Sequence, residues 1–291
     1  MQSLFKSIAI IGRRATPSLD APLRHLAKTL TALDARVFFE DCTAQEHGIT
    51  EYQSLARDTI GKLADLVIVL GGDGMMLGAA RLVVPYHVPL VGVNMGRLGF
   101  MTDIPLSEME DQIQAIVTGE FVPEERILLE ATVEREGKTI NRELAFNDVV
   151  ISRGNTGAMI EFEIFIDRGF VCSQRGDGLI ISTPTGSTAY ALASGGPILH
   201  PSLPAIALVP ICPQSLSNRP LVVTDTSEVE FVLTRAKDVH VFYDNQSDYR
   251  LQELDRVRVK RFRNTLRILH PTSYHYYDTL REKLRWGEQI L

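Results

Sequence analysis

The chain carries a short loop, Gly71-Gly72-Asp73-Gly74, whose residue types suit phosphoryl transfer. The glycines have no side chains to keep a phosphate at a distance, and they allow positive φ angles. A loop that only cradles a pyrophosphate has no use for the carboxylate of Asp73, because like charges repel. The carboxylate fits a general base that takes a proton from an attacking hydroxyl, or a ligand of a divalent metal. The alternative is a tight turn in which Asp is a turn residue.

The residues around the loop place it at the end of a buried strand. Residues 66–70 are apolar throughout, as expected for a parallel strand with helices on both faces of its sheet. Residues 75–81 favour the start of a helix. Ligands bind at the carboxyl ends of such strands. The spacing fails the dinucleotide fingerprint GxGxxG, because Leu77 stands at its third glycine.

A second segment, Phe146-Asn147-Asp148-Val149-Val150, places two polar residues inside an apolar run. An amide suits the edge of a base, and a carboxylate accepts hydrogen bonds from ribose hydroxyls. The alternative is a strand entry where Asn and Asp satisfy nearby backbone groups. The residues alone leave both interpretations open.

A third segment runs from Arg175 to Tyr190 and is dense in polar groups. An Asp177-Gly178 step leads into a short apolar strand, and five hydroxyl residues then surround one proline and one glycine. A helix is expected from Ser187 or Thr188, and the free N–H groups of its first turn would attract phosphate. A capped helix explains one or two of the hydroxyls. Five of them beside Asp177 and Tyr190 favour a ligand site.

The first part of the chain alternates short apolar runs with helical patterns. The predicted strands are residues 8–12, 37–39, 66–70 and 90–93. Four leucines between residues 23 and 33 recur at spacings of three and four, which predicts a helix with one apolar stripe. Another helix is expected at Ser107, which with Glu110 would form a capping box. Residues 1–120 are therefore predicted to form an α/β domain with a doubly wound parallel sheet.

Residues 121–275 show a different pattern, with short runs rich in β-branched and aromatic residues. The predicted strands are residues 128–134, 144–152, 159–166 and 231–234. Hairpin turns are expected at residues 136–138 and 167–169, and one short helix after Ser187. This part is predicted to be a predominantly β domain. Residues 276–291 are expected to hold a C-terminal helix that packs back on the first domain.

The composition narrows the class of protein. A net charge of -6 argues against a nucleic-acid binder that neutralises phosphates. Basic residues at 256–263 largely alternate, as on one solvated strand face, with a nucleic-acid groove as the alternative. The three cysteines form no CxxC pair, and no apolar stretch approaches the roughly 20 residues that span a bilayer. We expect a soluble, cytoplasmic protein with no nucleic-acid or membrane partner.

Taken together, the three segments resemble the NAD kinases, which phosphorylate the 2′-hydroxyl of the adenosine ribose of NAD to give NADP. The resemblance extends from about Ile8 to Tyr277. The GGDG loop is shared with diacylglycerol, sphingosine and 6-phosphofructokinases, whereas residues 177–190 are specific to NAD kinases. Residues 173–175 resemble the enzymes of Gram-negative bacteria. The implied fold is an α/β domain followed by a β-rich, NAD-binding domain, as in the NAD kinases and diacylglycerol kinases.

The resemblance implies a role for each matching position. Asp73 would be the general base, with Gly71 and Gly72 as a phosphate loop. The implied substrate-binding residues are Gly74, Asn147, Asp148, Arg175, Asp177, Thr188, Ala189, Tyr190, Ala193 and Gln246. It further implies ATP as the donor, NAD as the acceptor, a divalent cation such as Mg²⁺, and assembly as a homodimer or homotetramer.

Four positions depart from the common family pattern. Met75 follows the loop where many members have Thr, and Asp148 stands where Glu is common. Ala158 replaces a side chain that contacts substrate in some close relatives, and Asn245 replaces a common Gly. None of these changes removes the proposed base, but each alters an expected contact.

Two other functions fit part of the sequence. A lipid or sugar kinase would share the GGDG loop, although the chain lacks an amphipathic or lipid-anchoring segment. A non-catalytic NAD(P)-binding regulator would have no use for Asp73 beside a phosphate. The sequence therefore favours an ATP-dependent NAD kinase.

Overall fold

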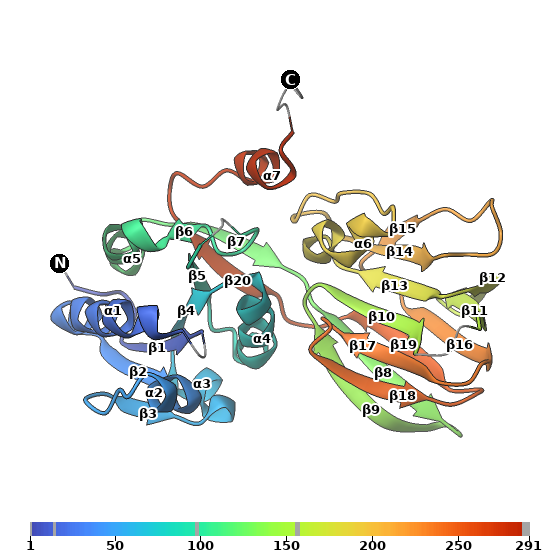
Figure 1. Ribbon diagram of the computed structural model, residues 1–291, viewed down its shortest axis with the longest axis horizontal. Coiled ribbons are helices and arrows are strands. Elements are labelled where there is room, and N and C mark those ends of the chain that lie inside the picture. Colours follow the sequence, from blue (N-terminus) through green and yellow to red (C-terminus); the bar gives the residue numbers. More distant parts are fainter. Residues whose placement is uncertain (1, 14–15, 97–98, 155–157, 287–291) are drawn as a thin grey trace. The chain divides into compact units, whose positions relative to one another are not determined.

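The computed structural model describes residues 2–13, 16–96, 99–154 and 158–286, and the chain divides into two compact units (Figure 1). Unit 1 contains Met1–Glu125 and Leu266–Leu291, and unit 2 contains Arg126–Thr265. The strand β20 (Leu266–His270) belongs to the sheet of unit 1, whereas the sequence boundaries placed it in the second domain. A short apolar strand carries no local signal of the sheet that it joins.

Unit 1 is built on one sheet, in the order β3-β2-β1-β4-β5-β20-β7, with β6 paired to β5. Its other strands are β1 (Ser7–Gly12), β2 (Arg36–Glu40), β3 (Gln53–Leu55), β4 (Leu66–Gly71), β5 (Leu90–Asn94), β6 (Ile104–Pro105) and β7 (Val122–Arg126). The pairs from β3 to β20 are parallel. The strand order reverses between β1 and β4, so the sheet is doubly wound as predicted. Its ligand-binding crevice is expected at the carboxyl ends of these two strands.

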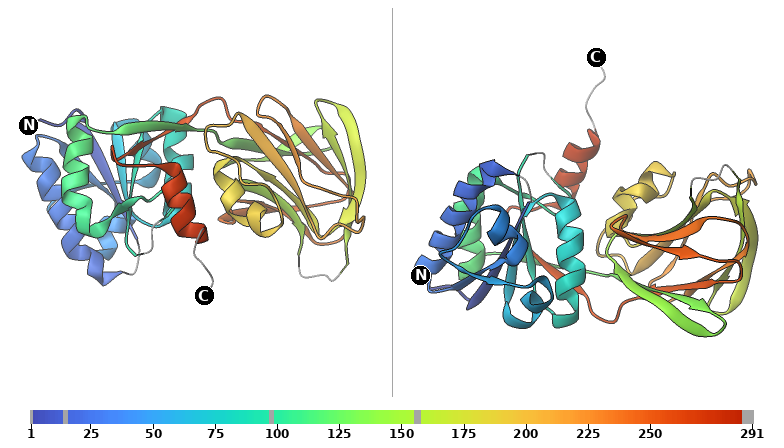
Figure 2. Two further views of the ribbon diagram at one scale, coloured as in Figure 1. Left: turned by 90° about the horizontal axis from the view of Figure 1, so that it is seen from above. Right: turned by 60° about the horizontal axis from the view of Figure 1, so that its bottom comes forward.

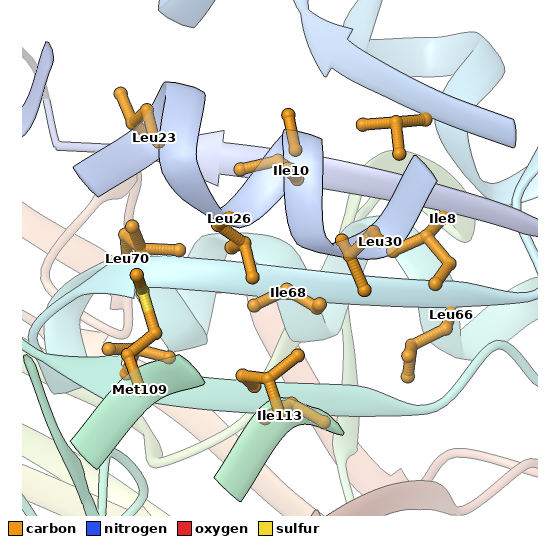
Figure 3. Close-up of a cluster of buried hydrophobic side chains, with 14 of the residues drawn as sticks. Ile8, Ile10, Leu23, Leu26, Leu30, Leu66, Ile68, Leu70, Met109 and Ile113 are labelled. Atoms are coloured by element: carbon orange, nitrogen blue, oxygen red, sulfur yellow. The ribbon is translucent and has the colours of Figure 1, made fainter. Parts of the chain in front are cut away.

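Helices cover both faces of this sheet (Figure 2). They are α1 (Asp20–Ala32), α2 (Asp41–Glu46), α3 (Arg57–Leu63), α4 (Asp73–Val83) and α5 (Met109–Thr118), with 3-10 turns at Pro17–Leu19, Val84–Tyr86 and Leu106–Glu108. The last helix of the unit is α7 (Tyr276–Leu284), which follows β20. Leucines of α1 pack with Met109 and Ile113 of α5 against Ile8, Ile10 and Ile68 of the sheet (Figure 3). This apolar contact fixes the direction in which the strand ends point.

The predicted capping box at Ser107 is wrong. The helix α5 begins after Glu108, and no side chain caps it, because Ser107 lies in the preceding 3-10 turn. Glu110 instead accepts hydrogen bonds from His25, at 2.7 Å, and Thr29, at 3.3 Å, on α1. A tertiary partner on α1 therefore replaces the local one.

Unit 2 consists of two antiparallel six-stranded sheets, in the orders β15-β14-β13-β10-β17-β18 and β12-β11-β16-β19-β8-β9. The strands are β8 (Leu129–Arg135), β9 (Lys138–Ala145), β10 (Asp148–Arg153), β11 (Ile160–Ile166), β12 (Gly169–Gly176), β13 (Gly178–Ser182), β14 (Ala205–Ile211), β15 (Leu221–Thr224), β16 (Val229–Arg235), β17 (Val239–Tyr243), β18 (Ser247–Leu251) and β19 (Arg256–Arg261). Val149 and Ile151 of β10 join the core between the sheets. Val150 points to the opposite face, which Ala191 of α6 (Tyr190–Ala193) helps to cover.

The hairpin turns at residues 136–138 and 167–169 are confirmed by positive φ angles at Glu136, Gly137, Asp167 and Arg168. The single strand expected at 144–152 is wrong, because β9 ends at Ala145 and β10 begins at Asp148. The backbone between them turns its N–H groups toward a carboxylate, as described below, and so leaves the ladder.

The basic run at 256–263 forms part of β19, and its side chains are paired with acids. Arg256 and Arg258 contact Glu230 at 2.5 and 2.8 Å, and Lys260 lies 3.9 Å from Glu130. This agrees with a solvated strand face. In the described part of the chain, the helices are all too short or too polar to cross a membrane.

Candidate functional site

A cavity of about 340 Å³ in unit 1 contains the predicted glycine loop. Gly71, Gly72 and Asp73 line it together with Arg13, which follows β1, and Lys283 of α7. The cavity therefore lies where the strand order reverses, as the open-sheet rule requires. Two cationic side chains at this point favour an anionic ligand.

Asp73 is the first residue of α4, and a loop that follows β5 holds its carboxylate. Oδ2 accepts the N–H of Phe100 at 2.8 Å. Oδ1 accepts the N–H of Met101 at 3.1 Å and the hydroxyl of Thr102 at 3.2 Å. A carboxylate offers about four lone-pair directions. Because this loop uses three, one remains for a donor from the cavity.

The loop glycines act through their missing side chains. An ideal Cβ on Gly72 or Gly74 would meet no atom within 4 Å, so both leave open space. A Cβ on Gly71 would lie 2.4 Å from the sulfur of Met75, so that methionine fills the room which Gly71 leaves. Gly72 has a φ of −121°, so this position does not use the positive φ that was expected of the loop glycines.

Two residues that hold this loop escaped the sequence analysis. A Cβ on Gly99 would lie 2.2 Å from both Asp73 Oδ1 and Thr102 Oγ1, so only glycine fits against the carboxylate. Asn94 ends β5 and donates to Thr102 Oγ1 at 3.1 Å. The sequence did carry a signal for Asn94, because a polar residue at the carboxyl end of a buried strand lies at the ligand-binding edge of a parallel sheet. Gly99 had no comparable local signal.

Unit 2 has a cavity of about 450 Å³, which brings together four of the predicted binding residues. They are Asn147, Asp148, Ala189 and Tyr190. Tyr190 is 46% exposed although aromatic, so its ring presents free surface. A cavity of this size is in the range of small-molecule sites.

Asp244, which the sequence analysis did not single out, fixes the first two of these residues. Its carboxylate accepts the N–H groups of Phe146, Asn147 and Asp148 at 2.9, 2.7 and 3.3 Å. Asp244 and Asn245 have φ angles of 52° and 53°, which form a type I′ turn between β17 and β18. Asn adopts this conformation readily, so Asn245 is a suitable replacement for the common Gly.

The hydroxyls of residues 182–188 bind other groups of the protein, whereas their number in the sequence favoured a ligand site. Thr183 donates to the carbonyls of Phe146 and Asn147 at 2.7 and 3.2 Å, and Ser187 donates to Pro184 at 2.6 Å. The hydroxyl of Thr185 is also engaged, by a buried Arg126 at 3.1 Å. Helical structure here begins as a 3-10 helix, Thr185–Thr188, and the α-helix α6 that follows it has only four residues. Thr183 supports Asn147, because its hydroxyl binds the backbone carbonyls of that residue and of Phe146.

Asn147 and Asp148 line the cavity, the first with an unsatisfied polar atom and the second with a buried carboxyl group. The Oδ1 atom of Asn147 is buried and has no hydrogen-bond partner among the described residues. Asp148 is 4% exposed, and burial, followed by the nearby charge of Asp244, raises the pKa of its carboxyl to about 7. Buried polar groups are normally paired, so this pair suits a polar ligand.

The remaining predicted binding residues lie outside the lining of this cavity. Gly178 pairs with Ser152 and Ser182 with Asp148, so Asp177 lies beyond the opposite end of β13, roughly 16 Å along the strand from Asp148, and Arg175 lies further back in the chain, on β12. Arg153 holds both carboxylate oxygens of Asp177, at 2.7 and 3.2 Å. The others are Gly74 of the glycine loop in unit 1, Thr188, whose hydroxyl donates to the carbonyl of Thr185, and the exposed residues Ala193 and Gln246.

A doubly wound sheet with a carboxylate in the glycine loop at its switch point defines a nucleotide-dependent phosphotransferase. Comparison with known proteins narrows this class. The ATP-NAD kinase N-terminal domain matches residues 13–121, and the ATP-NAD kinase C-terminal domain matches residues 146–270. The chain belongs to the NAD kinase family.

Named relatives span the full length of the chain. NAD kinases of Chromobacterium violaceum and Laribacter hongkongensis are 60% and 57% identical to it, with 100% of each chain covered. Yeast NADH kinase, solved in complex with NADH, superposes with a TM-score of 0.91 at 25% identity, over 98% of this chain and 89% of that one. An Archaeoglobus fulgidus NAD kinase, solved with ATP, shares the fold at 20% identity, with a TM-score of 0.76 over 97% and 100% of the two chains.

The raised pKa of Asp148 predicts a pH-dependent effect of Asp148→Asn on stability. Between pH 4 and pH 7 the folded carboxyl keeps a proton that the unfolded chain has lost, so the free energy of unfolding falls as the pH rises. The asparagine removes this loss, which for a shift from 3.8 to about 7 amounts to at most about 4 kcal/mol. We expect the variant to gain more in Tm at pH 8 than at pH 4.5. An equal Tm difference at both values, or a similar trend in the exposed control Asp111→Asn, would contradict this account.

Proposed function

We propose that this chain transfers the γ-phosphate of ATP to the 2′-hydroxyl of the adenosine ribose of NAD and forms NADP. The Asp73 carboxylate carries the proposal, because it lines the switch-point cavity with one acceptor direction left over. The names of the relatives support the reaction. The NADH and ATP bound by the two solved kinases support the substrates.

In the proposed reaction, Asp73 accepts the proton of the ribose hydroxyl as its oxygen bonds to the γ-phosphorus. The bond between that phosphorus and the bridging oxygen breaks, and ADP leaves with the electron pair. The hydrogen bonds from Phe100, Met101 and Thr102 fix the orientation of the carboxylate before the substrate arrives. Such prior positioning is the main protein contribution to phosphoryl transfer.

The cations of the cavity are proposed to bind the donor phosphates. Arg13 and Lys283 line the same cavity as Gly72, where a Cβ would meet nothing within 4 Å. The Nζ atom of Lys283 lies 5.8 Å from the ring centroid of Phe100, so a cation–π contact holds the amine over the loop whose N–H groups bind Asp73.

A divalent cation, Mg²⁺ in the first instance, is proposed to accompany ATP. The described residues contain no group of three or more His, Cys, Asp or Glu side chains placed to hold a metal. Mg²⁺ in kinases is commonly held by phosphates and water with one or two carboxylates, so the residues fit an ion that arrives with the nucleotide. When bound, it would neutralise charge that develops on the phosphates.

Asn147 and Asp148 are proposed to bind the adenosine part of NAD. The buried Oδ1 atom of Asn147 is an acceptor that suits the exocyclic amine of adenine. Asp148, with its shorter reach than Glu, would accept from a ribose hydroxyl. Ala189 and the exposed ring of Tyr190 supply an apolar surface for the base.

The family resemblance also leads us to propose a cytoplasmic homodimer or homotetramer. Phe170 and Val171, which are 60% and 42% exposed on the edge strand β12, support self-association. Analytical ultracentrifugation of the purified chain measures the oligomeric state.

Replacing the proposed base tests the reaction. General-base catalysis contributes about 10²–10⁴-fold, so Asp73→Asn should lower kcat for NADP formation by at least about 100-fold, with KM values near those of the wild type. A coupled assay with ATP, Mg²⁺, NAD and an NADP-specific dehydrogenase measures this.

The matched control is Asp65→Asn, because Asp65 also accepts two successive backbone N–H groups, from Lys6 at 2.9 Å and Ser7 at 3.0 Å, outside the cavity. It reports the structural cost of the same exchange and should keep kcat. Near-normal NADP formation by Asp73→Asn removes Asp73 from the mechanism, and an inactive wild type removes the proposed function.

The phosphate role of Lys283 gives a second prediction. Lys283→Met keeps the apolar stem and removes the charge, and a hydrogen bond to a charged group is worth about 1.5–3 kcal/mol. We expect KM for ATP to rise at least about tenfold, while KM for NAD changes little. Lys62→Met, on the exposed end of α3, is the control. A variant whose KM for ATP equals that of the control would show that Lys283 binds no phosphate.

A further inference from the structure

His270 is a fully buried ionisable residue that the proposed reaction does not use. It lies at the end of β20, and its side chain is 0% exposed. Its Nδ1 atom is 2.9 Å from Asp103 Oδ2, and its Nε2 atom is 3.1 Å from Glu124 Oε2. The ring of Tyr274 stacks on it at a centroid distance of 3.8 Å. Both ring nitrogens of His270 therefore face carboxylate oxygens.

This arrangement favours the protonated form of His270. A neutral imidazole has one N–H donor, whereas both carboxylates can be satisfied only by two. Burial alone lowers the pKa of His270, but the hydrogen bonds and charges of Asp103 and Glu124 outweigh it, and its pKa is raised. Loss of the proton would leave one nearly buried carboxylate facing a lone pair, since their side chains are only 7% and 16% exposed.

The bridge is one residue away from the loop that holds Asp73. Asp103 follows Thr102, whose hydroxyl donates to Asp73 Oδ1. Thr102 also accepts from Asn94 at the end of β5, the strand that pairs with β20. The loop is therefore held at Thr102 by Asn94 and at Asp103 by His270.

We propose that the His270 imidazolium is a positioning residue, which bridges Asp103 and Glu124 and thereby keeps the loop of residues 99–102 in the geometry that orients Asp73. The inference rests on the proposed role of Asp73 as the base. His270 acts through Asp103 and touches no substrate. Deprotonation of His270 loosens the loop and lowers the turnover number without removing a substrate contact.

The groups around His270 determine the pH at which it loses its proton. Asp103 faces it from the segment before β6, Glu124 faces it from β7, and Tyr274 stacks on it from the turn before α7. The paired strand β5 carries no ionisable side chain, and Arg267 on β20 pairs with Glu125. Because the folded pKa is raised, the stabilisation is complete below the ordinary value of about 6.5 and is lost as the pH rises through the folded value.

The decisive variant is His270→Gln, which keeps one amide donor and cannot titrate. Small misplacement of a catalytic group costs up to about 100-fold, so kcat for NADP formation should fall about tenfold or more, with KM for NAD unchanged. The alkaline decline of kcat that follows the titration of His270 in the wild type should be absent from the variant. His25→Gln, which breaks an exposed pair with Glu110 in the same unit, should retain the wild-type profile.

A second readout does not depend on activity. The Phe100 and Met101 amides donate to Asp73, and their hydrogen exchange should accelerate in His270→Gln but not in His25→Gln. If the variant does not fold, the wild type decides, because protection from exchange at these amides, after correction for the intrinsic pH dependence of amide exchange, should fall with the deprotonation of His270 measured by NMR. Unchanged exchange, or a profile in His270→Gln that matches the wild type, overturns the positioning role. If the wild type makes no NADP but exchange at these amides still accelerates when His270 is deprotonated or replaced, the bridge is retained and the proposed function is rejected.

Discussion

A carboxylate that is removed from water must find donors, and in each unit this constraint shapes the candidate site. Asp73 accepts the N–H groups of Phe100 and Met101, and Asp244 accepts those of three residues at Phe146–Asp148. Backbone donors are spaced by the chain itself, so the position of each loop is fixed relative to its carboxylate. A catalytic or binding group held in this way needs little reorganisation when a ligand arrives.

The same need for donors explains why Asp244 and Asp73 have different roles. Asp244 uses its oxygens on the protein and so acts as a support for Asn147 and Asp148. Asp73 uses most of its acceptor directions on the protein but lies in the lining of a cavity. Both carboxylates line a cavity, but Asp244 is bound by three backbone N–H groups that fix the neighbouring residues, whereas Asp73 is oriented by its loop toward a ligand.

Sequence reasoning located Asp73 because its setting is local. The apolar run of β4 has to be buried on both faces, and the residue after such a strand lies at the ligand-binding edge. The loop at 99–102 left no such signal, since its partner Asp73 is 27 to 29 residues away in the chain. Likewise β20 carries an ordinary strand pattern, and only its pairing with β5 reveals that it returns to the first sheet.

The hydroxyl-rich segment shows why composition can point to the right place for the wrong reason. Ser and Thr hydroxyls that hold a backbone and hydroxyls that hold a phosphate look the same in a sequence. Thr183 binds the carbonyl of Asn147, and a Cβ on Gly186 would lie 2.1 Å from that oxygen. The segment is therefore held against Asn147, the proposed binding residue, by hydrogen bonding and close packing. A sequence pattern that is specific to a family need not consist of residues that contact the ligand. Residues that hold a binding loop in its only possible conformation produce an equally distinctive pattern.

One buried carboxylate of unit 2 differs from the others in its partners, and the difference supports the proposed binding role of Asp148 without reference to any relative. Asp255 is fully buried, and Arg135 holds both its oxygens at 2.8 and 2.7 Å, while Arg153 does the same for the partly buried Asp177. Asp148 is nearly as buried as Asp255 but has a second carboxylate, Asp244, as its neighbour, and its pKa rises to about 7. A fold selected for stability alone would pair it or replace it. Its retention at the wall of a cavity, beside the buried Oδ1 atom of Asn147, is therefore better explained by a ligand than by the fold.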